Sequence, residues 1–204
     1  FSMRFANAST TFANFLFFWY NTNTVKGGTM YLQQILPDTG LYDWAVQLLK
    51  IAFPAEERRD DTEQLKVMSH PDYRLCAIFD KIPVGVVGYW ETPQFVYLEN
   101  FCISPEKRNG GYGSKTLQLL SSSDKLLVLE IELPVDELTI RRKNFYLRNG
   151  MVSNAFLHIQ PHYRKQDADL PLEVLSFRRP LSQEEYNVFR KYLDDNVDVI
   201  TRKC

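Results

Sequence analysis

The feature that most constrains this chain is a glycine-rich turn between an apolar strand and a helix. The segment from Phe101 to Ser114 is FCISPEKRNGGYGS, in which an apolar run ends at Ser-Pro and three glycines lead into a helix-compatible stretch. Glycine lets backbone N–H groups turn outward together, because no Cβ blocks the torsions that this requires. The first amides of a helix lack intrahelical partners and lie at the positive end of its dipole. The turn therefore predicts a phosphate-bearing ligand held mainly by backbone groups.

Spacing distinguishes three types of phosphate-binding turn. A P-loop needs a glycine before Lys-Thr, and Ser114 stands in that place. A dinucleotide-binding turn needs a third glycine where Thr116 stands. The pattern that fits is Arg-x-x-Gly-x-Gly, formed by Arg108, Gly111 and Gly113. This pattern resembles the pyrophosphate loop of the GNAT family of N-acetyltransferases, which bind acetyl-coenzyme A.

Length and composition are typical of one domain. The chain has 204 residues, of which 45% are hydrophobic and 14% aromatic, enough to bury a substantial core. Its 24 basic and 25 acidic residues nearly cancel, so the overall charge favours neither nucleic acid nor an anionic membrane as a partner. Cys76 and Cys102 lie in apolar strand contexts, typical of buried thiols in a reducing compartment, which predicts a cytoplasmic protein. The cysteines lack metal-ligand spacing, so no metal is expected.

The first 29 residues differ from the rest of the chain. Phe12 to Tyr20 is rich in aromatic residues but too short to span a bilayer, and the segment lacks the features of a signal peptide. Lys26 to Gly28 can be encoded by a purine-rich ribosome-binding sequence just upstream of Met30. We therefore expect residues 1–29 to be an extension, non-native or flexible, of a bacterial protein that starts at Met30. The alternative is an ordered arm that packs on the domain.

Hydrophobic periodicity predicts alternating strands and helices from Met30 onward. The predicted strands are Tyr31–Leu36, Tyr73–Phe79, Val84–Trp90, Phe95–Ile103, Lys125–Leu133, Ala155–Ile159 and Leu172–Phe177. The predicted helices are Leu41–Phe53, Thr62–Met68, Ser114–Ser121, Asp136–Arg148 and Gln183–Asp194, the last opened by a capping box of Ser182 and Glu185. The apolar face of this last helix is expected to pack on the domain or on a second subunit of a homodimer.

A second motif supports the resemblance. The order β-α-α-β-β-β-α-β-α-β-β is that of the GNAT elements, and the segment RKNFYLRNGM, from Arg142 to Met151, is similar to the family's Ala/Asn-x-x-Phe-Tyr-x-x-x-Gly-Phe. The resemblance covers about Met30 to Phe177. It implies an α/β (α+β) fold, in which helices flank a mixed, mostly antiparallel sheet of about six to seven strands. That sheet is expected to be splayed between the fourth and fifth strands. The domain would span residues 30–180, followed by a C-terminal helical segment over 181–204.

The resemblance also implies how acetyl-CoA is held. In the family, pantetheine lies between the two splayed strands like an added strand, so backbone groups of Phe101 and Ile103 are expected to pair with it. An amide near Cys102 would polarise the thioester carbonyl. The pyrophosphate would be cradled by the amides of Arg108, Asn109, Gly110, Gly111, Tyr112, Gly113 and Ser114. Asn144 would bond the pantetheine arm, unless it is only a polar residue on the helix surface.

One residue of the loop departs from the family pattern. The commonest loop has glycine directly after the arginine, and this chain has Asn109 there. Asparagine tolerates positive φ better than most residues, so we expect the loop geometry to survive. The Arg108 side chain would add positive charge beside the phosphates, the alternative being a solvated loop arginine.

Two residues are candidates for proton transfer. Tyr146 is the candidate general acid, because the family's helix tyrosine lies near the sulfur and a phenol roughly matches a departing thiol. Its alternative role is packing against Phe145. Glu99 is the candidate general base, at a strand position where some small-molecule acetyltransferases of the family carry an acidic residue. An outward-pointing strand glutamate is the alternative, and Glu132 is a weaker candidate. None of the three histidines has a partner visible in the sequence.

The resemblance therefore implies an N-acetyltransferase of the bacterial small-molecule type. It would move an acetyl group from acetyl-CoA to a primary amine of a small molecule, directly, in a ternary complex. Two alternatives stay open: a protein N-terminus or lysine as the acceptor, and a non-catalytic CoA-binding module that acts as a sensor or binds a partner. The expected acceptor walls, residues 53–70 and 160–170, carry charges of both signs and do not identify the acceptor.

Overall fold

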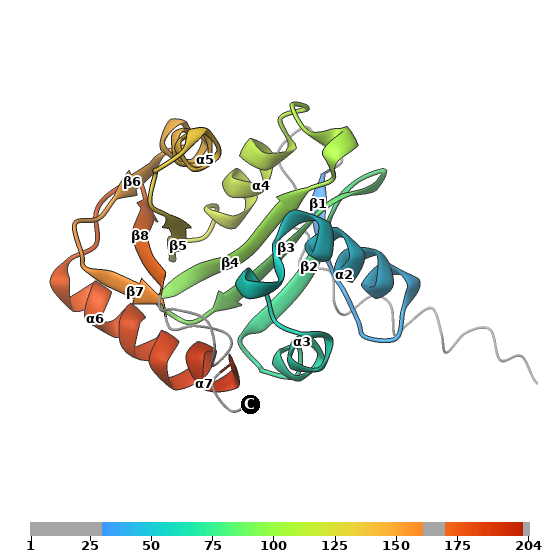
Figure 1. The fold of residues 1–204 in the computed structure, drawn as a ribbon, viewed down its shortest axis with the longest axis horizontal. Coiled ribbons are helices and arrows are strands. Elements are labelled where there is room, and N and C mark those ends of the chain that lie inside the picture. Colours follow the sequence, from blue (N-terminus) through green and yellow to red (C-terminus); the bar gives the residue numbers. More distant parts are fainter. Residues whose placement is uncertain (1–29, 161–169, 202–204) are drawn as a thin grey trace, which may run out of the picture.

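A computed structural model describes residues 30–160 and 170–201 of the chain (Figure 1). The expectations for residues 1–29 and for part of the second acceptor wall lie outside these ranges. The strands are β1 Tyr31–Gln34, β2 Tyr73–Asp80, β3 Ile82–Glu91, β4 Phe95–Ile103, β5 Leu126–Glu132, β6 Met151–Ser153, β7 His158–Gln160 and β8 Leu170–Phe177. The helices are α2 Gly40–Ala52, α3 Asp61–Val67, α4 Tyr112–Leu120, α5 Glu137–Arg148, α6 Gln183–Tyr192 and α7 Asp198–Thr201. Short helical turns are η1 Ala55–Glu57, η2 Pro105–Lys107 and the π-helical η3 Leu193–Val197.

The strands form one eight-stranded sheet. Its order is β1-β2-β3-β4-β5-β8-β6, and β7 also pairs with β8. The β4–β5 pair is parallel, and the other pairs are antiparallel. The prediction of a mixed, mostly antiparallel sheet flanked by helices is confirmed, with one strand more than expected.

Most element boundaries agree with the sequence prediction, and the differences have local causes. β6 was not predicted, because three residues are too short to show a period. The predicted strand Ala155–Ile159 is reduced to β7. α4 begins two residues earlier than predicted, because Gly111 adopts a left-handed conformation and caps it. The predicted capping box of Ser182 and Glu185 is present at the start of α6.

The helices cover the two faces of the sheet and define two hydrophobic cores. Apolar side chains of α2, α3, α6 and η3 pack on one face, which we call the α6 face, around residues such as Trp90 and Phe189. Apolar side chains of α4 and α5 pack on the other face, which we call the α4 face, where Leu117 and Tyr146 lie. The C-terminal segment is part of the first core, because Phe189 and Leu193 are almost completely buried.

The sheet opens between β4 and β5. These two strands pair only from Phe95 to Leu98 and from Leu126 to Leu129, although both continue beyond that point. On its other side, β4 carries a bulge at this same place: Tyr89 of β3 pairs with Leu98 and Gly88 with Asn100, which leaves Glu99 as the extra residue. A bulge bends its strand and increases the twist, so β4 turns away from β5 just after the last pair. The predicted splay is confirmed.

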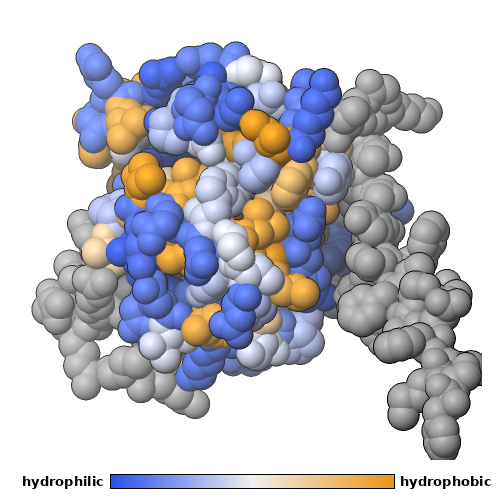
Figure 2. Space-filling model, turned by 90° about the vertical axis from the view of Figure 1, so that its right-hand side faces the viewer, coloured by the Kyte–Doolittle hydropathy of each residue, from blue (hydrophilic) through white to orange (hydrophobic). Residues whose placement is uncertain are grey.

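The described surface carries no obvious large apolar face in the view of Figure 2, where hydrophobic residues form small patches among hydrophilic ones. Within the described ranges, no helix is both long enough and apolar enough to cross a membrane.

Candidate active site

The backbone of β4 directs some of its N–H and C=O groups toward the opening. The amide of Ser104 donates to Val84 O of β3 over 2.9 Å, and Cys102 pairs with Val86 in the same register. Because neighbouring residues of an antiparallel strand direct their N–H and C=O groups to opposite sides, Cys102 faces β3 whereas Phe101 and Ile103 face the opening. These are the two residues predicted to pair with pantetheine. An amide that polarises a carbonyl in the opening would therefore come from Phe101 or Ile103 rather than from Cys102.

The loop that follows β4 has the backbone conformation that the glycine pattern suggested. Asn109 has φ +65° and Gly111 has φ +75°, both in the left-handed region. The expectation that asparagine would accept positive φ is confirmed. Gly111 is the N-cap of α4 and offers no side chain to its first amides, which in any helix lack intrahelical acceptors. The start of α4 therefore presents backbone donors at the positive end of the helix dipole.

Contacts around α4 place the other loop residues. A Cβ on Gly113 would lie 2.9 Å from Phe145 Cζ, so glycine lets the Phe145 ring lie against the start of α4. The Tyr112 hydroxyl donates to Asp80 on β2 over 3.1 Å, which leaves the backbone of Tyr112 as its contribution to the loop. Arg108 is exposed, and its Nε donates to Ile103 O over 3.3 Å at the end of the opening. Gly110 lies just before α4, Ser114 lies in the first turn of that helix, and Asn144 is exposed on α5.

Tyr146 lies on the α4 face of the sheet. Its side chain is buried, and its ring meets that of Phe145 edge to face with a centroid distance of 5.2 Å. Burial raises the pKa of Tyr146 to about 12, partly offset by nearby Arg142. The phenol is therefore protonated at neutral pH, the state that a proton donor requires.

The Glu99 carboxylate is held in a buried ion pair on the α6 face. Its Oε1 lies 2.6 Å from an Arg59 guanidinium nitrogen, and each side chain is 2% exposed. The Trp90 indole N–H donates to Oε2 over 3.1 Å. A guanidinium does not release its proton in proteins, so Arg59 keeps a positive charge beside this carboxyl group. The base role of Glu99 stays a prediction, and Glu132, the weaker candidate, is paired with Arg142.

A second buried carboxylate lies beside the opening and was not predicted. Glu130 contacts His158 Nε2, and both side chains are almost completely buried. The Tyr97 hydroxyl donates to Glu130 Oε2 over 2.6 Å, and His158 Nδ1 lies 3.1 Å from the Tyr186 hydroxyl. The only signal in the sequence is that Glu130 interrupts an apolar strand. Its partner lies 28 residues away, so the pair becomes visible only in the folded chain.

The two cysteine thiols in the described part of the chain are unsuited to covalent catalysis. Cys76 and Cys102 are free and buried, as predicted, and burial raises the pKa of each thiol to about 12. A thiol in such surroundings stays protonated and weakly nucleophilic at neutral pH. Among the described residues, no three His, Cys, Asp or Glu side chains form a group that could hold a metal ion.

Comparison with known proteins identifies the family. The model of the acetyltransferase (GNAT) family matches residues 38–151. A protein from Bacteroides thetaiotaomicron, described as an acetyltransferase of the GNAT family, is 33% identical over 81% of this chain and 97% of that one, with a TM-score of 0.75. No curated protein matches.

More distant solved structures share the fold. Arabidopsis thaliana Naa50, in complex with the bisubstrate analogue CoA-Ac-MVNAL, is 17% identical over 72% of this chain and 97% of that one, with a TM-score of 0.50. An aminoglycoside 6'-N-acetyltransferase complexed with coenzyme A is 16% identical over 74% of this chain and 99% of that one, with a TM-score of 0.51. The family match and the Bacteroides relative together establish that this chain belongs to the GNAT family of acetyltransferases.

Proposed function

We propose that the protein transfers the acetyl group of acetyl-CoA to a primary amine of a small molecule, in a ternary complex. The observation that carries this proposal is the opening between β4 and β5, which is followed directly along the chain by the loop from Arg108 to Ser114. The opening offers backbone groups of Phe101 and Ile103 to the pantetheine arm. The left-handed turn at Asn109 and Gly111 and the start of α4, where no side chain caps the first amides, offer backbone donors to the pyrophosphate.

The reaction forms a C–N bond and breaks the C–S bond of the thioester. The amine nitrogen must lose a proton, and the departing thiolate must gain one. Tyr146 would donate to the thiolate, since burial keeps its phenol protonated. Amides facing the opening, those of Phe101 and Ile103, would donate to the thioester oxygen as negative charge develops there.

The C-terminal helices support a small acceptor. Arg190 of α6 donates to Ile159 O of β7 over 3.1 Å, and the Tyr192 hydroxyl donates to Asp72, just before β2, over 2.8 Å. In Figure 1 the segment from α6 to α7 runs from the side of β7 toward α3. This segment contacts the sheet at both ends of the α6 face. A polypeptide acceptor would need space on that face for the residues next to its reacting amine, whereas a small amine would not.

The proposal is tested with the full chain, coenzyme A and two acceptor panels. Thiol release is measured with small primary amines and with peptides that offer an N-terminus or a lysine, and acetylated products are identified by mass. Calorimetry measures coenzyme A binding separately. We expect thiol release that depends on a small amine. Coenzyme A binding without thiol release on either panel would contradict an enzyme and favour the binding module. Turnover of peptides alone would contradict the small-molecule acceptor.

A further inference from the structure

We propose that Glu130 and His158 together accept the proton that the acceptor amine gives up, and that Tyr97 and Tyr186 position this pair. The inference rests on the proposed acetyl transfer to an amine. An ammonium acceptor loses two protons when it becomes an amide: one ends on the thiol of coenzyme A, and the other must leave through a base. The Glu130–His158 pair would take this second proton and later release it to solvent.

Strand pairing places Glu130 at the vertex of the opening. Leu98 and Leu129 are the last paired residues of β4 and β5, so Glu99 and Glu130 are the next residues along the two diverging strands. Glu130 lies two residues after Val128, on the α6 face of the sheet. Tyr97 pairs with Val128, and its hydroxyl reaches forward to Glu130 Oε2. The vertex is therefore flanked by two carboxylates.

Glu99 and Glu130 have different partners, which suit the two carboxylates to different chemical roles. Arg59 beside Glu99 carries a fixed positive charge, because a guanidinium keeps its proton at every physiological pH. His158 beside Glu130 carries an imidazole, which exists in neutral and charged forms. Of the two pairs, the Glu130–His158 pair is therefore the one whose two side chains can both accept a proton. The Glu99–Arg59 pair is suited to a permanent electrostatic or structural role.

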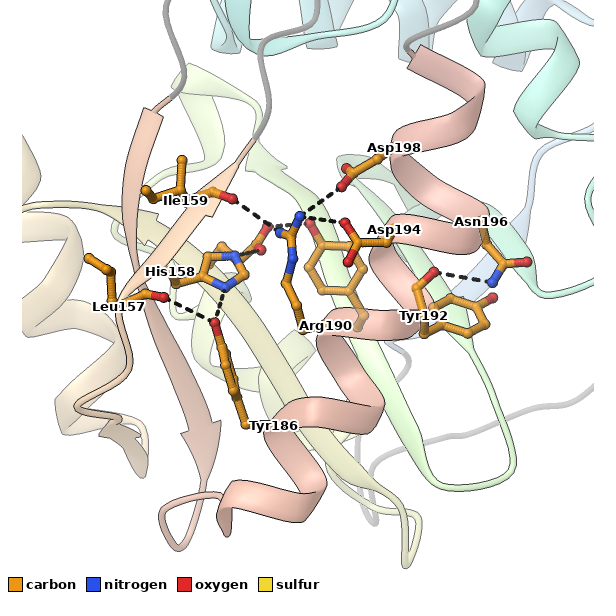
Figure 3. Close-up of polar contacts among 11 residues, drawn as sticks. Leu157, His158, Ile159, Tyr186, Arg190, Tyr192, Asp194, Asn196 and Asp198 are labelled. Atoms are coloured by element: carbon orange, nitrogen blue, oxygen red, sulfur yellow. Dashed lines mark hydrogen bonds and ion pairs between the residues drawn. The ribbon is translucent and has the colours of Figure 1, made fainter.

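The hydrogen bonds of His158 accommodate both protonation states (Figure 3). In one arrangement the Tyr186 hydroxyl donates to Leu157 O over 3.3 Å and accepts from Nδ1, so that both ring nitrogens carry a proton. In the other, the Tyr186 hydroxyl donates to Nδ1 and the ring is neutral, with its proton on Nε2 facing Glu130. Neither state leaves a ring nitrogen unpaired. The neutral ring keeps its Nε2–H on Glu130 Oε1, so the carboxylate can take the arriving proton on its other oxygen, Oε2, without a ring nitrogen losing its partner.

The charged groups around the pair are arranged to tolerate the extra proton. α6 contributes Arg190, whose guanidinium is paired with Asp194 at 2.6 Å and Asp198 at 3.2 Å (Figure 3). β4 contributes Tyr97 and β5 contributes Glu130, while the Phe189 ring of α6 stacks on the imidazole. With Arg190 offset by two carboxylates, Glu130 is the charge that directly faces His158.

The test compares pH–rate profiles of Glu130→Gln and His158→Gln with that of the wild-type protein, using the best small amine of the panel. We expect kcat/KM near pH 7 to fall about 100-fold or more. We also expect the acid limb of the wild-type profile to disappear, so that the rate keeps rising into alkaline pH as the free amine forms in solution. Coenzyme A affinity should be unchanged in both variants.

Tyr186→Phe is the conservative second variant, since it keeps the ring that packs in the core. It removes the oxygen that accepts from Nδ1, so the doubly protonated imidazole loses a partner and the acid limb should move to lower pH. Glu99→Gln tests the other carboxylate at the vertex, the candidate base named from the sequence, and the proposal requires its acid limb to remain where it is in the wild-type protein.

Melting temperatures separate a proton-accepting role from a structural one. Variants of Glu130, His158 and Tyr186 that melt earlier but keep the wild-type pH profile would overturn the proposal. Loss of the acid limb in Glu99→Gln alone would also overturn it and assign the base to Glu99. Wild-type protein that binds coenzyme A without turnover would contradict the proposed function itself, and the inference with it.

Discussion

The buried ion pair between Arg59 and Glu99 allows a sharp energetic prediction. The two side chains are 2% exposed, and their charged atoms are 2.6 Å apart. Replacing Arg59 with Met leaves the Glu99 carboxylate in the core without its positive partner, where the Trp90 N–H still donates to it. Replacing Glu99 with Leu removes the carboxylate that faces the buried guanidinium. The double variant removes both charges and fills the space with apolar groups of similar size.

The magnitude follows from the burial. Removing one partner of a buried pair costs about 3–5 kcal/mol in the free energy of unfolding, which for a chain of this length lowers the melting temperature by about 6–20 °C. Replacing both partners is close to neutral, so the double variant should recover most of the loss. Scanning calorimetry and urea unfolding of the three variants complete a double-mutant cycle.

An exposed pair provides the control. Lys191 and Asp195 are 2.7 Å apart but 76% and 54% exposed, so Lys191→Met should change the melting temperature little. The reasoning is refuted if the two core substitutions are additive, with the double variant as unstable as the sum of the singles. It is also refuted if Arg59→Met and Lys191→Met have equal effects, because burial would then not be the cause.

Three further predictions concern the loop, the acid and one pH-dependent contact. Gly111→Ala should lower the free energy of unfolding by about 1–2 kcal/mol, because alanine is strained at positive φ, and should weaken coenzyme A binding measured by calorimetry. Gly40→Ala, where an added Cβ meets nothing within 4 Å, should change neither quantity. Equal coenzyme A affinities in the two variants would exclude the loop from binding. Tyr146→Phe should lower kcat about 100-fold with unchanged coenzyme A affinity, and full turnover in thiol-release assays would remove its role as the acid. The Arg179 hydrogen bonds lower the pKa of Glu185 from 4.5 to about 2, so their stabilisation is present above pH 4.5 and is lost as the pH falls through about 2. The melting temperatures of Arg179→Met and wild type should therefore differ at pH 7 and converge near pH 2, and a pH-independent gap would contradict this assignment.

Several features of the fold were predictable because they depend on residues close together in the sequence. The loop asparagine was expected to accept positive φ and does so, and Gly111 adopts positive φ as well, because these torsions are set by the local side chains. The capping box of Ser182 and Glu185 spans only one helical turn. The bounds of β4 agree with the prediction, because an apolar run ended by Ser-Pro defines its limits.

The candidate site was less predictable because its chemistry depends on contacts between distant segments. Glu99 was recognised as an acidic strand residue. Its partner Arg59 lies before α3, and the strands β2 and β3 separate the two residues along the chain. Glu130 and His158 were not paired in advance, since neither strand's periodicity says which polar side chains meet in the core. The bulge that makes Glu99 an extra residue arises from the register with β3, which no local pattern encodes.

By itself, then, the sequence determined the donor side of this protein: the strand, the glycine turn and the helix start that resemble the GNAT loop, all contiguous in the chain. Only the tertiary structure decided which side chain pairs with each of the two carboxylates at the vertex of the opening. It placed an arginine beside one carboxylate and an imidazole beside the other. The physical reason is that a buried charge is stable only with a partner, and the fold selects that partner from residues far apart along the chain.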